Sequence, residues 1–135
     1  MQIITLATCF NRREKTIRAL SSLFSQSLTH DVEVSHFIVD DGSTDGTSDA
    51  ISQLFPTVNV ISGTGQLYWA GGMLYGFNNA IKSLDYDYLF VYNDDVVFYA
   101  DALQTLLSTS LNHLEHGNYD AHLIAGSFLD SAFHH

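Results

Sequence analysis

Residues 34–47, VSHFIVDDGSTDGT, join an apolar run to a cluster of turn residues. The first half predicts a buried strand, because strands of a parallel sheet that is covered on both faces are apolar along their length. The second half is rich in Asp, Gly, Ser and Thr and predicts a turn. Asp45 or Thr47 then caps a short helix, which Pro56 ends. A strand, a turn and a helix in this order predict one unit of a parallel α/β sheet.

The same alternation extends to both sides of this stretch. Strands are predicted at 3–7, 34–40, 58–61, 88–92 and 122–125. Between them, apolar residues three and four positions apart predict helices over 17–28, 51–55, 73–84 and 103–114. The order predicts a single α/β domain over residues 1–135, with a mostly parallel, Rossmann-like sheet and helices on both faces.

Composition excludes several classes of protein. The 135 residues carry a formal charge of −10, which argues against nucleic acid and anionic lipid as partners. A lone cysteine, Cys9, excludes a disulfide framework and a thiolate zinc site, and it fits a reducing compartment. The N-terminal apolar run precedes its basic residues, the reverse of a signal peptide, and no run is long enough for a membrane span.

Polar and acidic residues follow three of the predicted strands. Thr8–Asn11 follow the first strand, Asp40–Ser43 end the second, and Asn93–Asp95 follow the fourth. Ligands of open α/β sheets bind beyond the carboxyl ends of the strands, so we expect these clusters to lie together. Acidic pairs at one edge repel each other unless a cation or ligand donors compensate. Carboxylates with diphosphate oxygens as co-ligands suit Mg²⁺ or Mn²⁺.

Each cluster also has an interpretation without a ligand. DGSTDG is typical of a turn in which an Asp side chain caps the backbone, and NDD is typical of a helix cap. A calcium loop is excluded, because its third and twelfth positions would be Ser43 and Ser52. Cys9 has no evident base partner, which favours a small buried residue over a nucleophile. The purely structural interpretation is weakened because an apolar strand with an acidic end occurs twice.

Residues 62–72, SGTGQLYWAGG, are predicted to form a glycine-rich loop. The spacing does not fit G-x-G-x-x-G, and no P-loop lysine follows, so phosphate binding of the Walker type is excluded. Glycines let the backbone pass close to a ligand. Leu67, Tyr68 and Trp69 are too apolar for a free loop, so they either wall a nucleotide or sugar or pack into the core.

Four stretches, which arrive in the family's order and cover nearly the whole chain, resemble the N-terminal nucleotide-binding part of family 2 glycosyltransferases. They are TCFNRREKTIRALSSLFSQ, FIVDDGSTDGT, YWAGGMLYGFNNAI and YDYLFVYNDDVVFYADAL. The resemblance implies the GT-A fold. WAGGM together with NDDV is similar to rhamnosyltransferase-like members of bacterial polysaccharide pathways.

The resemblance also implies roles for individual residues. Thr8 and Phe10 would line the base, and Asp41 would accept a hydrogen bond from a pyrimidine N–H. Asp94 would approach the ribose and assist Asp95, which would bind a Mg²⁺ or Mn²⁺ ion that bridges the diphosphate. Asp95 is favoured as the ligand because an asparagine precedes Asp94 where many relatives have the first aspartate of D-x-D. Further candidates for nucleotide-sugar contact are Asn11, Trp69 and Gly72.

The implied activity is transfer of a sugar from a UDP- or dTDP-sugar to a hydroxyl of a glycan or lipid-linked acceptor. The resemblance implies a cytoplasmic protein, with peripheral attachment at the inner membrane face as an alternative. Family domains continue well beyond this length, and their later half supplies the acceptor site and the general base. We therefore expect a truncated or short domain that binds the donor but does not complete catalysis. We also expect it to self-associate through the surface that is left uncovered. A non-catalytic nucleotide-sugar-binding fragment is the alternative.

A phospho-acceptor receiver domain has a similar size and similar acidic strand ends. It requires an acidic pair after the first strand and a lysine late in the chain. Here the first strand ends in Thr8 and Cys9, and no lysine follows Lys82. The sequence therefore argues against this class.

Overall fold

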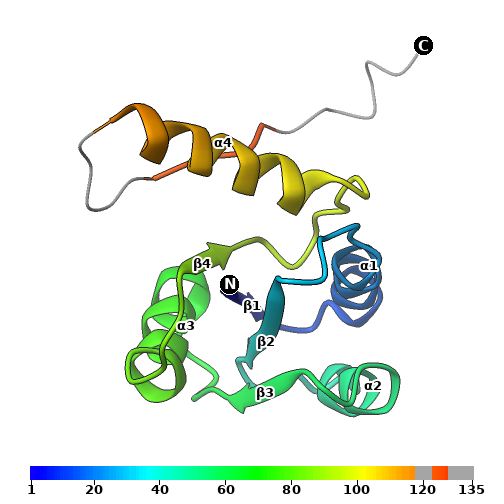
Figure 1. Cartoon of the computed structure of the whole chain (residues 1–135). Helices are drawn as coiled ribbons and strands as arrows, with labels where there is room; N and C mark the ends of the chain where they lie inside the picture. The colour runs from blue at the N-terminus through cyan, green and yellow to red at the C-terminus, as the bar shows by residue number, and fades with distance from the viewer. Residues whose placement is uncertain (118–122, 128–135) are drawn as a thin grey trace.

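The computed structural model describes residues 1–117 and 123–127. One four-stranded sheet, with strand order β3-β2-β1-β4, forms the centre of the molecule (Figure 1). All three strand pairs are parallel, as the sequence predicted. The strands are β1 (Gln2–Cys9), β2 (Glu33–Asp40), β3 (Asn59–Ser62) and β4 (Tyr88–Val91).

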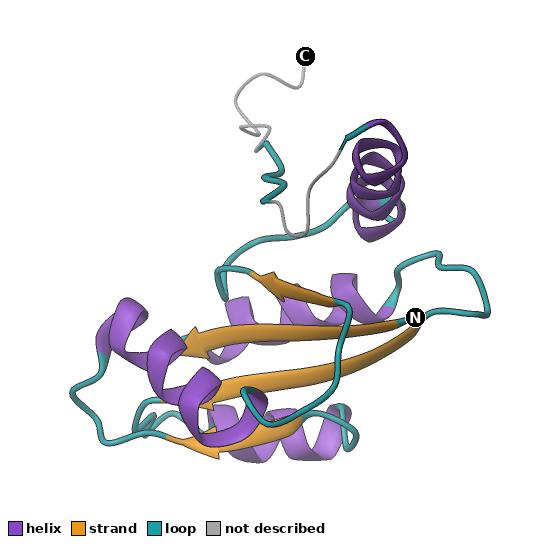
Figure 2. Cartoon of the chain, turned by 60° about the vertical axis from the view of Figure 1, so that its left-hand side comes forward, coloured by secondary structure: helices purple, strands orange, loops and turns teal. Residues whose placement is uncertain are grey.

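Helices cover both faces of the sheet, as predicted. In Figures 1 and 2, α1 (Arg13–Phe24) and α2 (Thr47–Leu54) lie on one face, α3 (Tyr68–Gly76) lies on the other, and α4 (Ala102–His116) lies beyond β4. The third helix continues directly into a π-helical turn, η1 (Phe77–Ile81).

The alternation of side chains along the central strands divides the core in two. On the α1 and α2 face, Ala7 and Ile38 pack with residues such as Leu20 and Ile51. On the α3 face, Leu6 and Val39 pack with a cluster that includes Ile81. The register aligns Cys9 with Asp40 and Asp40 with Ser62, so the carboxyl ends of β1, β2 and β3 lie at one edge of the sheet.

Two predicted helix boundaries were wrong. Helix α1 ends at Phe24 rather than near residue 28, because the chain then turns to the segment before α4. The Ser27 N–H donates to the Ala100 carbonyl (2.8 Å), and the Gln26 side chain donates to the Tyr99 carbonyl (2.8 Å). The glycine-rich loop is also shorter than predicted, because α3 already begins at Tyr68.

The predicted cap of α2 was wrong in position. Gly46, with a φ of 82°, occupies the N-cap. Asp45 nevertheless accepts a hydrogen bond from the Thr47 N–H through Oδ1 (3.1 Å). The Asp45 carboxylate therefore accepts from a backbone donor of the first turn, although Asp45 stands one position before the N-cap residue.

The predicted last strand, 122–125, was wrong where it can be compared. His122 lies outside the described residues, and residues 123–125 adopt no strand. The short apolar run at 123–125 is not buried against the sheet, so nothing offsets the conformational entropy lost by ordering it as a strand. Leu123 is instead 92% exposed. None of the helices described here combines the length and apolar character needed to cross a bilayer.

Candidate functional site

The carboxyl ends of β1, β2 and β4 and the start of α3 surround a cleft of about 530 Å³. The structure thus brings together the three strand ends that the sequence singled out. Two of the predicted site residues, Asn11 and Gly72, do not line this cleft. The lining residues are Thr8, Cys9, Phe10, Arg12, Asp41, Tyr68, Trp69, Asn93, Asp94 and Asp95.

Asp41 is buried beneath the segment that leads into α3. Its Oδ1 accepts a hydrogen bond from the Gly65 N–H (2.7 Å). Its Oδ2 accepts from the N–H groups of Leu67 (2.8 Å) and Tyr68 (3.2 Å). A carboxylate offers about four acceptor positions, so three bonds leave room for one ligand donor. Asp41 therefore holds the wall of the cleft and still faces its interior.

Asp40 does not join Asp41 in the cleft. Its Oδ1 accepts from the Ser43 N–H (2.9 Å), and its Oδ2 accepts from the Ser48 hydroxyl. Neighbouring strand residues point to opposite faces, which directs Asp40 to the α2 side and Asp41 to the α3 side. For Asp40 the turn-capping interpretation is therefore correct, and only Asp41 contributes to the cleft.

Asn11 joins two loops outside the cleft. Its side-chain Oδ1 accepts from the Thr44 N–H (2.8 Å), and its own N–H donates to the Ser43 hydroxyl (2.9 Å). Its φ of 48° lies in the left-handed region, which asparagine tolerates better than most residues. Asn11 thus fixes the turn after β1 against the turn after β2.

Gly72 contacts the cleft only indirectly, through Thr8. A Cβ at position 72 would overlap the Thr8 side chain, so glycine is required for α3 to lie this close to β1. The Thr8 hydroxyl is buried and has no hydrogen-bond partner within the described part of the chain. An unpaired buried hydroxyl is costly, and Thr8 is one of the residues that line the cleft.

Three aromatic side chains at the cleft are exposed. Phe10, Tyr68 and Trp69 are 52%, 82% and 51% exposed. Leu67, in contrast, packs into the core on the α3 face. Each of the two sequence interpretations of residues 67–69 is therefore correct for part of the segment. Leu67 belongs to the core, and Tyr68 and Trp69 form an aromatic wall of the cleft. Tyr68, for which the sequence left both interpretations open, has a φ of 56° and donates its N–H to Asp41.

Asp94 and Asp95 lie across the cleft from this wall, on the turn after β4. The Asp94 side chain is 10% exposed and the Asp95 side chain 41% exposed. Arg12, at the start of α1, contacts both carboxylates through Nη1, at 3.4 Å from Asp94 Oδ1 and 3.3 Å from Asp95 Oδ2. Burial raises the pKa of Asp94 and the charge of Asp95 adds to this, whereas the Arg12 guanidinium lowers it.

These two carboxylates fit a divalent cation that brings other ligands with it. No group of three or more His, Cys, Asp or Glu side chains within residues 1–117 and 123–127 is arranged to hold a metal ion. Mg²⁺ and Mn²⁺ accept one or two carboxylates when phosphate oxygens and water complete the shell. Burial of one carboxylate beside a second favours an added positive charge. The donor set therefore suits a metal–diphosphate complex better than a bare ion.

Cys9 is structural. It is 1% exposed, and burial, with contributions from Asp40 and Asp94, raises the pKa of its thiol above the usual range. The thiolate needed for nucleophilic attack is therefore disfavoured at neutral pH. This confirms the sequence interpretation of a small buried residue.

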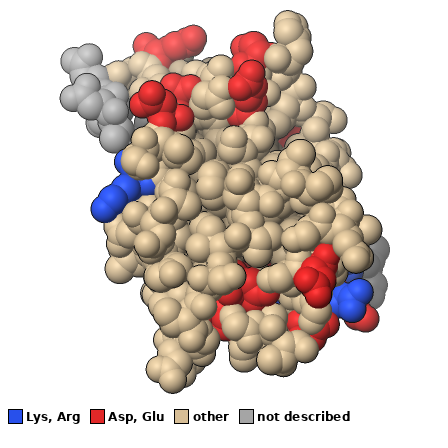
Figure 3. All heavy atoms as spheres, turned by 90° about the horizontal axis from the view of Figure 1, so that it is seen from below, with Lys and Arg blue, Asp and Glu red and all other residues tan. Residues whose placement is uncertain are grey.

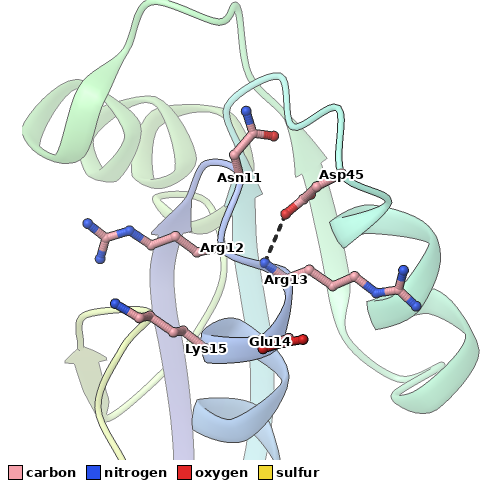
Figure 4. A pocket seen from close by; sticks show the side chains of 6 residues that line it. All are labelled: Asn11, Arg12, Arg13, Glu14, Lys15 and Asp45. Atoms are coloured by element: carbon pink, nitrogen blue, oxygen red, sulfur yellow. Dashed lines mark hydrogen bonds between the residues drawn. The ribbon is translucent and has the colours of Figure 1, made fainter.

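A second hollow of about 480 Å³ lies at the N-terminus of α1. Its lining combines four residues from the start of the helix with Asn11 and Asp45 (Figure 4). In Figure 4 the Arg12 and Lys15 side chains point to one side, and Arg13 points the opposite way, toward α2. The Arg13 N–H donates to Asp45 Oδ2 (3.0 Å).

Basic side chains are scarce elsewhere. The chain has five Lys and Arg against 15 Asp and Glu. Figure 3 shows a largely uncharged face on which acidic groups gather at two ends and few basic groups appear. Four of the five Lys and Arg residues occur between positions 12 and 18, and Arg12 among them lines the cleft: Arg12, Arg13, Lys15 and Arg18.

Comparisons with known proteins agree with this geometry. The family model "Glycosyl transferase family 2" matches residues 6–124. The chain is an α/β domain of the GT-A type and belongs to glycosyltransferase family 2. No curated protein matches the sequence.

Solved structures share the fold. The mannosyltransferase PcManGT from Pyrobaculum calidifontis, in complex with GDP-Man and Mn²⁺, is 20% identical, with a TM-score of 0.62 over 78% of this chain and 31% of that one. S. aureus TarS 1-349 in complex with UDP is 20% identical, with a TM-score of 0.68 over 84% of this chain and 33% of that one. The TarS 1-349 complex with UDP-GlcNAc is also 20% identical, with a TM-score of 0.66 over 84% and 32%. The chain thus spans about a third of these structures.

Proposed function

We propose that this chain binds the nucleotide-sugar donor of a family 2 glycosyltransferase. The observation that carries the proposal is the cleft, where an unpaired hydroxyl, three exposed aromatic rings and two adjacent carboxylates meet at the carboxyl edge of a parallel sheet. This edge is where α/β sheets bind nucleotides. The solved structures that share the fold include complexes with GDP-Man, UDP and UDP-GlcNAc.

The base binds on the β1 and α3 side of the cleft. Phe10 supplies an exposed ring against which a base can stack, and the Thr8 hydroxyl supplies an unused polar group. The remaining acceptor position of Asp41 takes a pyrimidine N–H. Tyr68 and Trp69, at the start of α3, line the cleft on this side and contact the base or the sugar. Asn11 and Gly72 act indirectly, by fixing the loop after β1 and the approach of α3.

The diphosphate binds on the β4 side. Asp95 is the principal ligand of Mg²⁺ or Mn²⁺, and the more buried Asp94 assists it and approaches the ribose. When bound, the metal would neutralise charge on the leaving diphosphate. PcManGT was solved with Mn²⁺ beside its nucleotide sugar, which supports this assignment by analogy of fold.

The whole protein transfers the sugar to a hydroxyl of a glycan or lipid-linked acceptor. Motif similarity favours a dTDP- or UDP-sugar and a rhamnosyltransferase-like member of a polysaccharide pathway, acting in the cytoplasm or at the inner membrane face. Exposed apolar side chains near β4, such as Val91 and Val97 (48% and 58% exposed), favour self-association of the isolated chain.

Calorimetry tests the proposal. UDP, dTDP and GDP are titrated into the chain with and without Mn²⁺, and we expect Mn²⁺ to strengthen pyrimidine diphosphate binding. The Asp95→Ala variant should lose the Mn²⁺-dependent part of the affinity and keep its fold. Asp85→Asn is the control, because this exposed residue precedes β4 at the opposite edge of the sheet. Absence of nucleotide binding by the parent chain would reject the proposal.

A further inference from the structure

Arg12 lies on the carboxylates assigned to the metal. One nitrogen, Nη1, is 3.4 Å from Asp94 Oδ1 and 3.3 Å from Asp95 Oδ2. An arginine that is built into a permanent ion pair more often turns two nitrogens toward one carboxylate. Here a single nitrogen is shared by two carboxylates, as a shared cation would be. The guanidinium therefore contacts both carboxylates that we assign to the metal ion.

Both contacts are weak enough to exchange. Charge-assisted hydrogen bonds between nitrogen and oxygen are typically about 2.7–2.9 Å long, shorter than either contact. The Arg12 side chain is 48% exposed, and solvent-exposed ion pairs contribute little to stability. The guanidinium can therefore leave the carboxylates for solvent without disturbing the core.

The carboxylates nevertheless need a positive neighbour. Asp94 is mostly buried and stands beside a second acid, and the charges of Arg12 and, more weakly, Lys15 offset this arrangement. Both side chains point to the same side of α1 in Figure 4. In a chain with a net charge of −10, few other groups can supply this compensation.

We propose that Arg12 is an internal counter-ion that competes with the divalent cation for Asp94 and Asp95; the inference rests on the metal site of the proposed function. A Mg²⁺ ion that binds these oxygens at about 2.0–2.1 Å brings a double positive charge next to the guanidinium, and the repulsion between the two cations displaces Arg12. The diphosphate that arrives with the metal offers the displaced Arg12 a new anionic partner. Metal alone is therefore disfavoured, and metal together with nucleotide is favoured.

The test is a Mn²⁺ titration followed by electron paramagnetic resonance of the free ion, without nucleotide. Arg12→Gln should bind Mn²⁺ roughly 2- to 20-fold more tightly than the parent, the range expected for losing two weak ion pairs of an exposed guanidinium. Arg13→Gln is the matched control. It removes the same charge from the adjacent residue, but its side chain points toward α2. We expect Arg13→Gln to match the parent, and Asp95→Asn added to Arg12→Gln to abolish the gain.

A second readout uses UDP. UDP should strengthen Mn²⁺ binding by a larger factor in the parent than in Arg12→Gln. Only the parent has a guanidinium that can move from the two carboxylates to the diphosphate. Equal Mn²⁺ affinities for Arg12→Gln and Arg13→Gln, in variants with parental circular dichroism, would overturn the inference. The metal titration contains no nucleotide, so it tests the inference about Arg12 separately from the proposed function. The proposed function fails only if the parent binds no nucleotide.

Discussion

The Asp41 carboxylate accepts a hydrogen bond from the Leu67 N–H at 2.8 Å, which connects the end of β2 to the segment that starts α3. These residues are 26 positions apart. Two further N–H groups of the same segment donate to the same carboxylate. The residue proposed to recognise the base therefore also positions the aromatic wall of the cleft.

This double role gives Asp41→Asn two measurable effects. The amide presents N–H groups where backbone N–H groups need an acceptor, so at least one of three bonds is lost, at a cost of about 1–3 kcal/mol. We expect a lower free energy of unfolding in urea and roughly 5- to 150-fold weaker UDP binding. Asp49→Asn, on the exposed side of α2, controls for charge. Parental UDP affinity in a destabilised Asp41→Asn variant would restrict Asp41 to holding the loop.

The glycines of α3 provide a test of its close approach to the sheet. A Cβ on Gly76 would lie 2.7 Å from Val39 Cγ2 and 3.0 Å from Leu6 Cδ1, inside a packed core. We expect Gly76→Ala to lower the free energy of unfolding by about 1–3 kcal/mol.

Gly71 is the matched position for this test. A Cβ there would meet Leu67 Cβ at 3.5 Å, an ordinary contact. Gly71→Ala should therefore stabilise the protein by up to about 1 kcal/mol, since alanine is favoured over glycine within a helix. Urea unfolding of both variants gives the comparison. Equal stabilities would contradict the packing described for α3 and β1.

His36 predicts a pH dependence of stability. Burial lowers its pKa to about 4, and its Nδ1 lies 2.8 Å from the Thr5 hydroxyl. In the unfolded chain the pKa of this histidine returns to about 6.5. Between these two pKa values the unfolded state therefore binds a proton that the folded state does not bind. Stability should therefore fall as the pH decreases from about 6.5 toward 4, by an amount on the order of 3 kcal/mol.

The measurement is urea unfolding across this pH range for His36→Asn and for the control His30→Asn, whose histidine is exposed. The control should keep the steep loss, and His36→Asn should flatten it. The difference between the variants removes the contribution of Asp94, whose raised pKa acts in the opposite direction. Parallel pH profiles would show that His36 is not held neutral in the fold.

Short-range patterns predicted the sheet and the edge where the cleft forms. Apolar runs such as 88–92 and the acidic residues behind them are properties of neighbouring positions, and parallel topology then brings the strand ends together. The start of α3 was missed because its glycines have a low helix propensity and predict a loop. The position of this helix depends instead on its packing against β1. The wall that Tyr68 contributes depends on the same packing.

Arg12 was missed for a different reason. Its carboxylate partners lie 82 and 83 positions away, and no local pattern joins them. The available signal was a run of cations directly after a strand end in an otherwise acidic chain. Likewise, DDGS reads as one acidic pair, but the two-residue period of a strand sends Asp40 and Asp41 to opposite faces.

The isolated chain should bind a donor and show no measurable transfer. It spans about a third of the solved structures that share its fold, and the family resemblance assigns the general base and the acceptor site to the later part of such domains. General base assistance contributes about 10²–10⁴ in rate, and acceptor orientation contributes more, so the loss of both brings turnover near background. The assay is transfer from UDP- and dTDP-sugars to a mixed acceptor extract with Mn²⁺, with a longer family 2 glycosyltransferase as positive control. Metal-dependent transfer by the 135 residues alone would refute this expectation and direct the search for the base to Glu115, Asp120 and Asp130.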